Sequence, residues 1–356
     1  MMRVMSIPDP ARISQALLAW YDVSRRDLPW RGTTDPYAVW VSEVMLQQTQ
    51  VGRVIDYWTR FLDALPTVES LAGASLDDVL ALWSGLGYYS RARRLHAAAR
   101  EVVDERGGRL PETAAGLREL PGMGDYTSAA VASIAFGEPV PVLDANVVRV
   151  LSRLLASTGD PRRAGVRREL RAAAAEIVRV GRPGDVNQAL MELGALVCLP
   201  REPACDDCPL FSFCAGRQSG DPRTYPAAAG RPEVLTLREA ALVLCGEGTV
   251  LLTRERHPRG WWNDLWRLPT KELGSGRPEE PVWESVVKDE LPDPPGKAGS
   301  IRYSVTRHRV VLDVYVAELD AVVLPGRGFR WVLLETVQDL AFPAPHMRAL
   351  GLAGVA

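Results

Sequence analysis

Apolar residues recur at helical spacing through the first two thirds of the chain. Between residues 39 and 51, Val39, Trp40, Val44 and Val51 fall at intervals that predict a helix, and Pro36 suits its first turn. Similar periodicity, broken by Gly and Pro, continues from residue 11 to residue 217. We therefore expect an almost continuously helical region, with helices at about 11–21, 36–47, 51–63, 76–83, 91–105, 125–136, 144–156, 163–180 and 184–198.

The pattern changes beyond residue 217. Residues 218–236 carry Gly, Pro and small residues without an apolar period, which is typical of an interdomain linker. Short apolar runs then predict strands, and two other segments predict helices. The second region is expected to be an α+β unit, with strands at 239–245, 250–254, 301–306 and 310–319 and helices near 280–289 and 344–353.

Length and composition limit the class of protein. A chain of 356 residues is too long for one ordinary core, so two or three domains are expected. No uninterrupted apolar run reaches the roughly 18 residues of a membrane span, and the N-terminal segment is too short and too rich in Pro for a secretory signal. A cytoplasmic location is the resulting expectation.

Net charge gives no general attraction to nucleic acid, since it is only -2. A DNA partner would have to be held by local clusters and by oriented backbone N–H groups. One cluster comprises Arg91, Arg93 and Arg94. A second is interpreted as a solvated helix face, and it comprises Arg162, Arg163, Arg167, Arg168 and Arg171.

One acid interrupts the apolar pattern of the 39–51 segment. Glu43 stands among Val, Trp and Met residues, and a carboxyl buried there would tend to keep its proton because low dielectric disfavours the charged form. Such a group is a candidate general acid near neutral pH. Taken alone, the helix favours a salt-bridged surface Glu, because buried acids are uncommon; the motifs described below favour the buried acid.

A glycine-rich turn joins two of the predicted helices. In Leu120-Pro121-Gly122-Met123-Gly124, two glycines let the backbone turn tightly and approach a ligand. The helix that starts near Asp125 would then direct free N–H groups at an anion such as a DNA phosphate. The same pattern also fits an ordinary helix–turn–helix connection.

Asp144 stands about twenty residues beyond this hairpin. It is placed to cap the next helix by accepting hydrogen bonds from Asn146 and Val147. Capping is a sufficient structural reason for this residue, and the functional interpretation puts its carboxylate at the mouth of the hairpin, facing a substrate. Both can hold, because one oxygen can cap while the other faces the site.

Four of the five cysteines lie between positions 198 and 214. Each can supply a thiolate ligand, and a disulfide framework is not expected in a long cytoplasmic chain. A zinc site with four thiolate ligands is one interpretation of this spacing. Cys245, far away in a predicted strand, is interpreted as a buried apolar residue.

Longer motifs extend these observations to a known family. There are four such motifs: L-P-W-R at 28–31, S-E-V-M-L-Q-Q-T-Q-V at 42–51, G-L-G-Y-Y-S-R-A-R at 85–93 and N-Q-A-L-M-E-L-G-A-L-V-C at 187–198. They resemble the helix–hairpin–helix DNA glycosylases of the endonuclease III superfamily. Within it, the chain resembles the MutY-type adenine glycosylases, strongly over residues 11–217. The resemblance implies a multidomain fold: an all-α glycosylase region at 1–217 (a six-helix module at 29–137 and an iron–sulfur module at 1–28 plus 138–217), a linker at 218–236, and an α+β MutT/Nudix-like domain at 237–356.

The resemblance also implies the cofactor and the type of reaction. Cys198, Cys205, Cys208 and Cys214 would hold a [4Fe–4S] cluster with a structural, DNA-facing role. The resemblance allows, in addition, a cation bound by hairpin carbonyls of Arg118, Leu120 and Met123. The lyase branch has a catalytic Lys where this chain has Tyr126, and the first 270 residues contain no Lys for a Schiff base, so a monofunctional enzyme is expected.

The implied substrate is duplex DNA in which adenine is mispaired with 8-oxoguanine or guanine, bound by a monomer after base flipping. Glu43 would protonate adenine at N7 and activate water, and ionised Asp144 would stabilise the positive charge that grows on the sugar. Tyr126 and Asn146 would hold Asp144. The walls of the adenine pocket would be Trp30, Arg31, Leu46, Val51, Gln188 and Met191, and other DNA contacts would come from Gln48, Thr49, Leu86, Gly87, Tyr88, Gly122 and Gly124, with Gln48 and Tyr88 as the wedge.

The C-terminal region resembles the MutT-like domain appended to MutY proteins. Residues 283–290 lack the R-E-x-x-E-E spacing of a Nudix hydrolase, so a recognition module without hydrolase activity is expected. Relatives read 8-oxoguanine with a Phe-Ser-His turn, where this chain has Thr306, Arg307 and His308. Three alternatives stay open: a lesion glycosylase with lyase activity on oxidised pyrimidines, a nucleotide hydrolase, and a cluster-bearing DNA-binding module without catalysis.

Overall fold

The computed structural model describes residues 7–227, 233–273, 291, 294–319, 322, 325 and 328–355. It separates into two compact units, Met1–Gly73 with Arg94–Gly230, and Ala74–Arg93 with Arg231–Ala356. The domain boundaries expected from the sequence cut the chain differently, since they assign residues 74–93 to the glycosylase region, and they remain a prediction. The helix predicted near 280–289 and the segment 283–290 lie outside the described residues.

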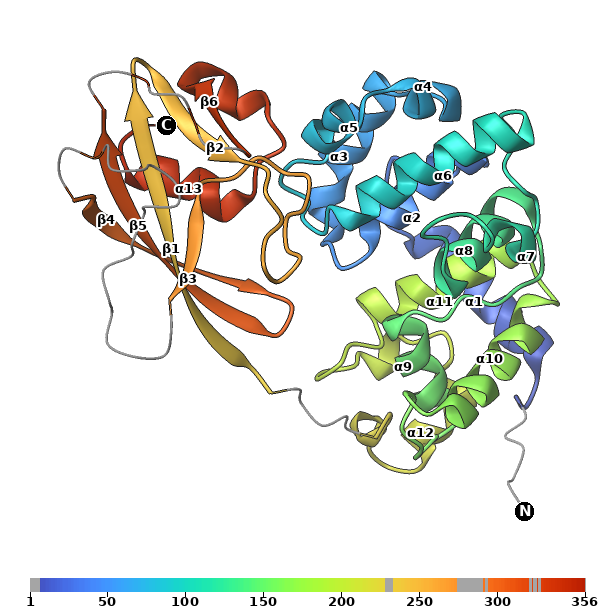
Figure 1. Cartoon of the computed structure of the whole chain (residues 1–356). Coiled ribbons are helices and arrows are strands. Elements are labelled where there is room, and N and C mark those ends of the chain that lie inside the picture. Colours follow the sequence, from blue (N-terminus) through green and yellow to red (C-terminus); the bar gives the residue numbers. More distant parts are fainter. Residues whose placement is uncertain are drawn as a thin grey trace. The chain divides into compact units, whose positions relative to one another are not determined.

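The first unit is helical throughout (Figure 1). Its first two helices begin alike, because Asp9 and Asp35 each accept a backbone N–H at the N-cap and a Pro follows at the first helical position. The helices of this unit are α1 (Pro10–Ser24), α2 (Pro36–Leu46), α3 (Val51–Ala64), α4 (Val68–Gly73), most of α6 (Ser90–Arg106), α7 (Ala114–Leu117), α8 (Asp125–Phe136), α9 (Ala145–Leu154), α10 (Ala164–Val178), α11 (Pro183–Leu196) and α12 (Ala215–Gln218), with short 3₁₀ turns at Cys205–Asp207, Phe211–Phe213 and Pro222–Thr224.

Two central helices position the functional side chains of this unit. Almost all of α2 is buried, including Ser42 and Glu43, as expected of a helix that is apolar on every side. Helix α11 packs against α1, α8, α9 and α10, and Leu190 and Leu193 are fully buried in its core. Polar residues on α2 and α11 are therefore held by rigid, tightly packed backbone.

The second unit is built on a six-stranded sheet of order β4-β5-β1-β2-β6, with β3 pairing separately with β1. β1 runs parallel to β5, and the remaining pairs are antiparallel. Helix α13 packs against β1 and β4 (Figure 1), and α5 (Leu76–Leu82) also belongs to this unit. The strands are β1 (Leu235–Gly246), β2 (Thr249–Thr253), β3 (Thr270–Leu273), β4 (Gly296–Val305), β5 (His308–Glu318) and β6 (Phe329–Leu333), followed by a 3₁₀ helix (Leu334–Asp339) and α13 (Ala344–Leu352).

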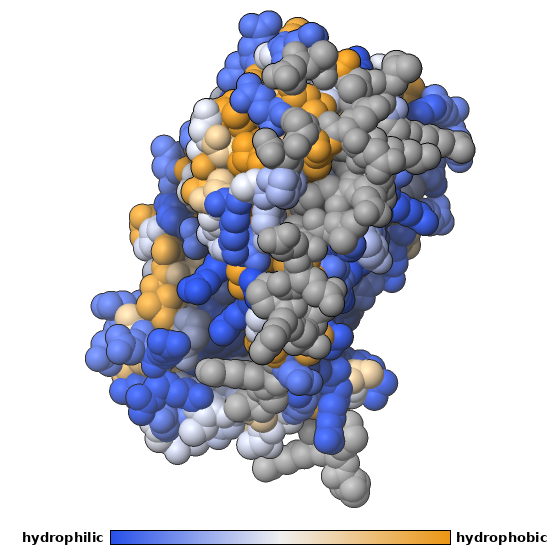
Figure 2. Space-filling model, turned by 60° about the vertical axis from the view of Figure 1, so that its left-hand side comes forward, coloured by the Kyte–Doolittle hydropathy of each residue, from blue (hydrophilic) through white to orange (hydrophobic). Residues whose placement is uncertain are grey.

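The predicted fold class, a helical region followed by an α+β unit, is confirmed. The sequence did not indicate α4 and α7, which are too short to show a period, or β3 and β6, which are short strands of mixed polarity. None of the described helices is long and apolar enough to span a bilayer. Hydrophilic residues cover much of the face shown in Figure 2, and hydrophobic residues gather there in separate patches.

Candidate active site

Glu43 is buried inside the helical unit, with only 5% of its surface exposed. The Tyr126 hydroxyl, from the first turn of α8, donates a hydrogen bond of 2.6 Å to Glu43 Oε2. Burial raises the pKa of Glu43, and the charge of Asp144 raises it further, whereas the Tyr126 hydrogen bond and the charge of Arg31 oppose the shift. The net direction is upward, so this carboxyl holds its proton to a higher pH than an ordinary Glu.

Asp144 is the N-cap of α9, as its position in the sequence predicted. Its Oδ1 accepts the backbone N–H of Val147 at 2.6 Å, and its Oδ2 accepts the side-chain amide of Asn146 at 3.0 Å. Burial raises the pKa of Asp144, and the net direction is upward, although these hydrogen bonds and the charge of Arg149 oppose the rise. Asp144 therefore has two donors that stabilise its ionised form, and among the described residues Glu43 has only the Tyr126 hydroxyl in that role.

One cavity of about 210 Å³ brings the two acids together. Tyr126 and Asn146 also line it, so all four predicted catalytic residues face the same space. The side chains that were predicted to form the adenine pocket line it as well, together with Thr49. These wall residues are Trp30, Arg31, Leu46, Val51, Gln188 and Met191.

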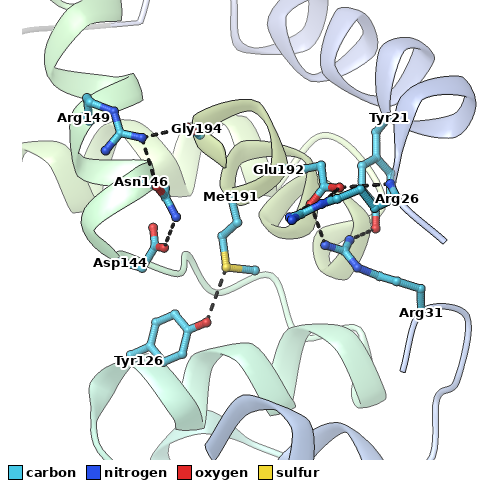
Figure 3. A network of polar contacts seen from close by, with 10 residues as sticks. All are labelled: Tyr21, Arg26, Arg31, Tyr126, Asp144, Asn146, Arg149, Met191, Glu192 and Gly194. Carbon is cyan, nitrogen blue, oxygen red and sulfur yellow. Dashed lines mark hydrogen bonds and ion pairs between the residues drawn. The ribbon is translucent and has the colours of Figure 1, made fainter. Parts of the chain in front are cut away.

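Four further lining residues were not predicted from the sequence: Arg26, Leu28, Glu192 and Ala195. Glu192 is 1% exposed and accepts hydrogen bonds from the backbone and guanidinium of Arg26 and from Arg31 (Figure 3). Arg31 also donates to the Tyr21 hydroxyl. Burial alone would raise the pKa of Glu192, but the Arg26 hydrogen bonds and the two arginine charges outweigh it and lower the pKa.

A helical spacing could have located Glu192. Four lining residues share one face of α11, because they are spaced at i, i+3, i+4 and i+7. They are Gln188, Met191, Glu192 and Ala195. Since Gln188 and Met191 were already assigned to the pocket, the same face pointed to Glu192. No comparable signal existed for Arg26, which reaches the cavity from a distant segment.

A chain of polar contacts leads from Asp144 toward the cysteines. Arg149 Nη2 donates to the Asn146 side-chain oxygen at 2.9 Å and to the Gly194 carbonyl at 2.7 Å (Figure 3). Its Nε donates to the Cys198 carbonyl at 2.8 Å. Gly194 permits this arrangement, because a Cβ there would lie only 2.6 Å from the Cβ of Asn146. Helices α9 and α11 are thus in direct backbone contact beside the cavity.

The four cysteines between 198 and 214 line a second cavity of about 30 Å³. Buried Arg153 donates to Cys198 Sγ at 3.3 Å and to the carbonyls of Leu199 and Pro200. Within the described ranges, no group of three or more His, Cys, Asp or Glu side chains is placed to hold a single metal ion. The thiols line this space, and burial raises the pKa of Cys208 to about 12. This donor set fits a multi-atom group whose positive charge stabilises thiolates.

Comparison with known proteins places this geometry in a family. Residues 41–176 match the model for HhH-GPD superfamily base excision DNA repair proteins, and residues 239–352 match the NUDIX domain model. The chain is 49% identical to the adenine DNA glycosylase of Rattus norvegicus over 352 residues, covering 95% of this chain and 66% of the relative. It is 41% identical to that of Mycobacterium tuberculosis over 229 residues, covering 64% of this chain and 74% of the relative.

The chain belongs to the adenine DNA glycosylase family. The resemblance to MutY-type enzymes, drawn from the sequence motifs, is thereby confirmed. Among solved structures, a thermostable thymine-DNA glycosylase is similar, with 31% identity and a TM-score of 0.54, covering 59% of this chain and 97% of that chain. The chain spans 42% to 66% of the length of its human, mouse and rat relatives.

The hairpin of this adenine DNA glycosylase family member has the backbone geometry expected of it. Gly122 has a φ of 80°, and a Cβ at that position would lie 2.6 Å from the Cβ of Arg94, so only glycine fits. Gly124 is the N-cap of α8 and leaves that helix without a side-chain cap. The N–H groups of its first turn therefore have no side-chain cap.

The second unit contains a cavity of about 340 Å³, lined by the predicted contact residues Leu86, Gly87, Tyr88 and Thr306. Trp261, Trp262 and Tyr303 supply aromatic walls. Arg307 and His308 are not among its lining residues, although the His308 ring lies against Trp261 at a centroid distance of 5.3 Å. Thr306, with a φ of 52°, begins the two-residue turn between β4 and β5.

The two predicted wedge residues have the same unusual backbone. Gln48 has a φ of 56° and Tyr88 a φ of 49°, a left-handed conformation that side chains other than Gly and Asn rarely adopt. Both side chains are exposed. Gln48 belongs to the first unit and Tyr88 to the second, so their action as a pair stays a prediction.

Proposed function

We propose that this protein is a monofunctional adenine DNA glycosylase of base excision repair. It hydrolyses the N-glycosidic bond of adenine mispaired with 8-oxoguanine, or with guanine, in duplex DNA after flipping the adenine out of the stack. The observation that carries the proposal is the single cavity that contains both Glu43 and Asp144 in unlike environments. Membership of the adenine DNA glycosylase family supports the choice of base.

The reaction requires one proton donor and one stabilising negative charge. Protonated Glu43 transfers its proton to N7 of adenine, the glycosidic bond breaks, and the base leaves as a neutral molecule. Because Tyr126 occupies Oε2, Oε1 carries the transferred proton. Water then adds its hydroxide to C1′ of the sugar and returns its proton to Glu43, so the balance is one water consumed and one adenine released.

Asp144 acts on the sugar. With Asn146 and Val147 donating to it, its carboxylate is fixed and ionised, and it stabilises the positive charge that develops as the bond breaks. The two acids thus divide the work by environment. Burial raises the pKa of both, but Asp144 has two hydrogen-bond donors that favour its ionised form, and Glu43 has the Tyr126 hydroxyl alone among the described residues.

The flipped adenine lies between the apolar side chains of Trp30, Leu46, Val51 and Met191. Polar groups of the cavity fix its orientation. Arg31 and Gln188 present donors to the base. Glu192 holds Arg26 and Arg31 in place, as its hydrogen bonds to both indicate. A strand-cleaving activity through a Schiff base is absent because position 126 is a tyrosine.

A [4Fe–4S] cluster fits Cys198, Cys205, Cys208 and Cys214, which line the cavity of about 30 Å³. These four cysteines would tie the loop after α11 together when the cluster is bound, and the cluster would supply no step of the hydrolysis. An absorption band near the violet edge of the visible spectrum and iron in the purified protein would support this assignment. Stoichiometric zinc would contradict it. A cation held by the hairpin carbonyls of Arg118, Leu120 and Met123 remains a further proposal.

The C-terminal unit recognises the base opposite adenine, without hydrolase activity. Its aromatic cavity, with Thr306 at the rim, supports a role for the turn of Thr306, Arg307 and His308 in reading 8-oxoguanine. Replacing all three by Ala is expected to remove the preference for 8-oxoguanine over guanine. An unchanged preference would show that the lesion is read elsewhere. The enzyme acts on the genome as a cytoplasmic, nucleoid-associated monomer.

The deciding experiment is single-turnover release of adenine from a duplex with adenine opposite 8-oxoguanine. Glu43→Gln should retain duplex binding and lose roughly two to four orders of magnitude in release rate. Glu105→Gln, on the exposed surface of α6, is the matched control and should behave as wild type. Wild-type protein that binds without releasing adenine would favour the DNA-binding module, and strand cleavage would favour the lyase.

A further inference from the structure

Two arginines of the cluster that the sequence pattern suggested to be a solvated helix face, Arg167 and Arg171 of α10, contact other elements. Arg171 Nη2 lies 3.1 Å from Oδ2 of Asp125, the first residue of α8 after the glycine hairpin. Arg167 Nη2 is directed at the Leu143 carbonyl at 3.4 Å, next to Asp144. Being four residues apart, Arg167 and Arg171 lie on one face of α10, and that face meets the start of α8 and the segment just before Asp144.

A third arginine completes the group from the hairpin side. Arg118 Nε lies 3.1 Å from Oδ1 of Asp125, so one carboxylate is shared by two guanidiniums. Both side chains are partly exposed: the exposed fraction is 53% for Arg118 and 33% for Arg171. Exposed ion pairs of this kind add little to stability. Each guanidinium has five N–H donors, so donors remain for another partner.

The charge balance explains why two arginines hold one acid here. The uncapped N–H groups at the start of α8 attract an anion, but the Asp125 carboxylate at the first helical position would repel it. Arg118 and Arg171 neutralise that carboxylate and leave one net positive charge. Arg167, which is exposed, adds a second. The positive charge then extends from the hairpin to the residue before Asp144.

We propose that Arg118, Arg171 and Arg167 form a phosphate-binding edge for the DNA strand that enters the cavity, in addition to the glycine hairpin. This edge binds successive phosphodiesters of the backbone and carries no sequence information. It fixes the position of the strand so that the flipped nucleotide meets Glu43 and Asp144. The inference rests on the proposed function, because it takes duplex DNA as the substrate.

The test measures affinity for a short undamaged duplex as the salt concentration is raised from about 50 to 200 mM. Arg171→Gln and Arg167→Gln should each weaken binding and reduce the slope of log K against log salt by about one. Arg168→Gln is the matched control, because Arg168 is exposed on the same helix about 100° round from Arg167. It should leave both quantities unchanged.

Three further measurements make the outcome decisive. Arg171→Lys retains the charge and should recover most of the slope, and Arg118→Gln should reproduce the loss from the hairpin side if Arg171→Gln fails to fold. Single-turnover adenine release at saturating enzyme should be unchanged in the control Arg168→Gln. If Arg171→Gln and Arg167→Gln match Arg168→Gln while wild type binds duplex, this inference alone is overturned. If wild type does not bind duplex, the proposed function is overturned with it.

Discussion

The Tyr126 hydroxyl lies 2.6 Å from Glu43 Oε2 and donates to it, while the Met191 sulfur lies 3.5 Å from the same hydroxyl. A donor to a carboxylate favours its ionised form. Tyr126 therefore lowers the pKa of Glu43 in a setting where burial raises it. The balance between these two effects decides over which pH range Glu43 can act as an acid.

Replacing Tyr126 by Phe removes the donor and keeps the ring. The pKa of Glu43 should then rise further, so the protonated form persists to higher pH and the alkaline limb of single-turnover adenine release shifts upward. The check is the pH profile of release for wild type and Tyr126→Phe under saturating enzyme. A profile that moves to lower pH would mean that Tyr126 acts on another group.

Glu43 should also affect stability with a defined sign. Because its folded pKa is raised, the unfolded chain ionises first as pH rises above about 4.3, and the folded protein loses stability up to the folded pKa. Glu43→Gln removes this loss, so it should unfold at a higher temperature than wild type at pH 8. The difference should vanish toward pH 4 in thermal unfolding, and a difference independent of pH would contradict this account.

Glu192 should behave in the opposite sense. Its folded pKa is lowered, so its stabilising contribution is complete above the unfolded pKa and is lost as pH falls through the folded value. Glu192→Gln should lower the free energy of unfolding by about 2–3 kcal/mol near neutral pH. This is less than the loss expected for a fully buried ion pair, because the Arg26 side chain is 34% exposed. Denaturant unfolding of wild type and Glu192→Gln at pH 7 and at pH 3 measures this difference in stability, which should be smaller at pH 3.

Arg149 should influence base release through Asn146. Arg149→Leu frees the Asn146 side chain, which then no longer fixes Asp144, and misplacement of a catalytic group lowers rates by about ten- to a hundredfold. Arg149→Lys keeps the charge but cannot bridge Asn146, Gly194 and Cys198 together, so it should also be slow. Single-turnover rates test this, and a wild-type rate in Arg149→Lys would show that only charge matters.

Thr306 combines a β-branched side chain with a φ of 52°. That conformation costs about 1–2 kcal/mol for most residues, and Asn tolerates it better. Thr306→Asn should therefore stabilise the β4–β5 turn by about 0.5–1 kcal/mol, measured by thermal unfolding. Thr306→Val keeps the branching and serves as the control, with no gain expected.

The sequence predicted long elements well because their apolar period is set by local geometry. Helix α2 was expected at 36–47 and runs over Pro36–Leu46, and the helix at 125–136 begins and ends as predicted. Strands β3 and β6 were missed, since residues such as those of Thr270–Leu273 become a strand only by pairing with β1. The sequence therefore predicts a helix or strand where the apolar period extends over many residues, but it does not predict which strands pair.

Some residues of the candidate site could likewise be predicted from local sequence, and others could not. Glu43 and Asp144 could be recognised because each interrupts a local pattern, an apolar helix in one case and a helix start in the other. Arg26 and Glu192 meet across 166 positions of sequence, a contact that no local pattern encodes. The α10 arginines were recognised as a cluster, but which of them would face the hairpin depends on how α10 packs.

Helix α11 connects the cysteine loop to the cavity that contains Glu43 and Asp144. Gln188, Met191 and Glu192 form part of the cavity wall from this helix, which ends at Leu196, two residues before Cys198. A released cysteine loop would leave the last turn of α11 without its anchor, and fraying would reach the base-binding wall within two turns. A disturbance of the cysteine loop would thereby reach the walls of the cavity that contains Glu43 and Asp144.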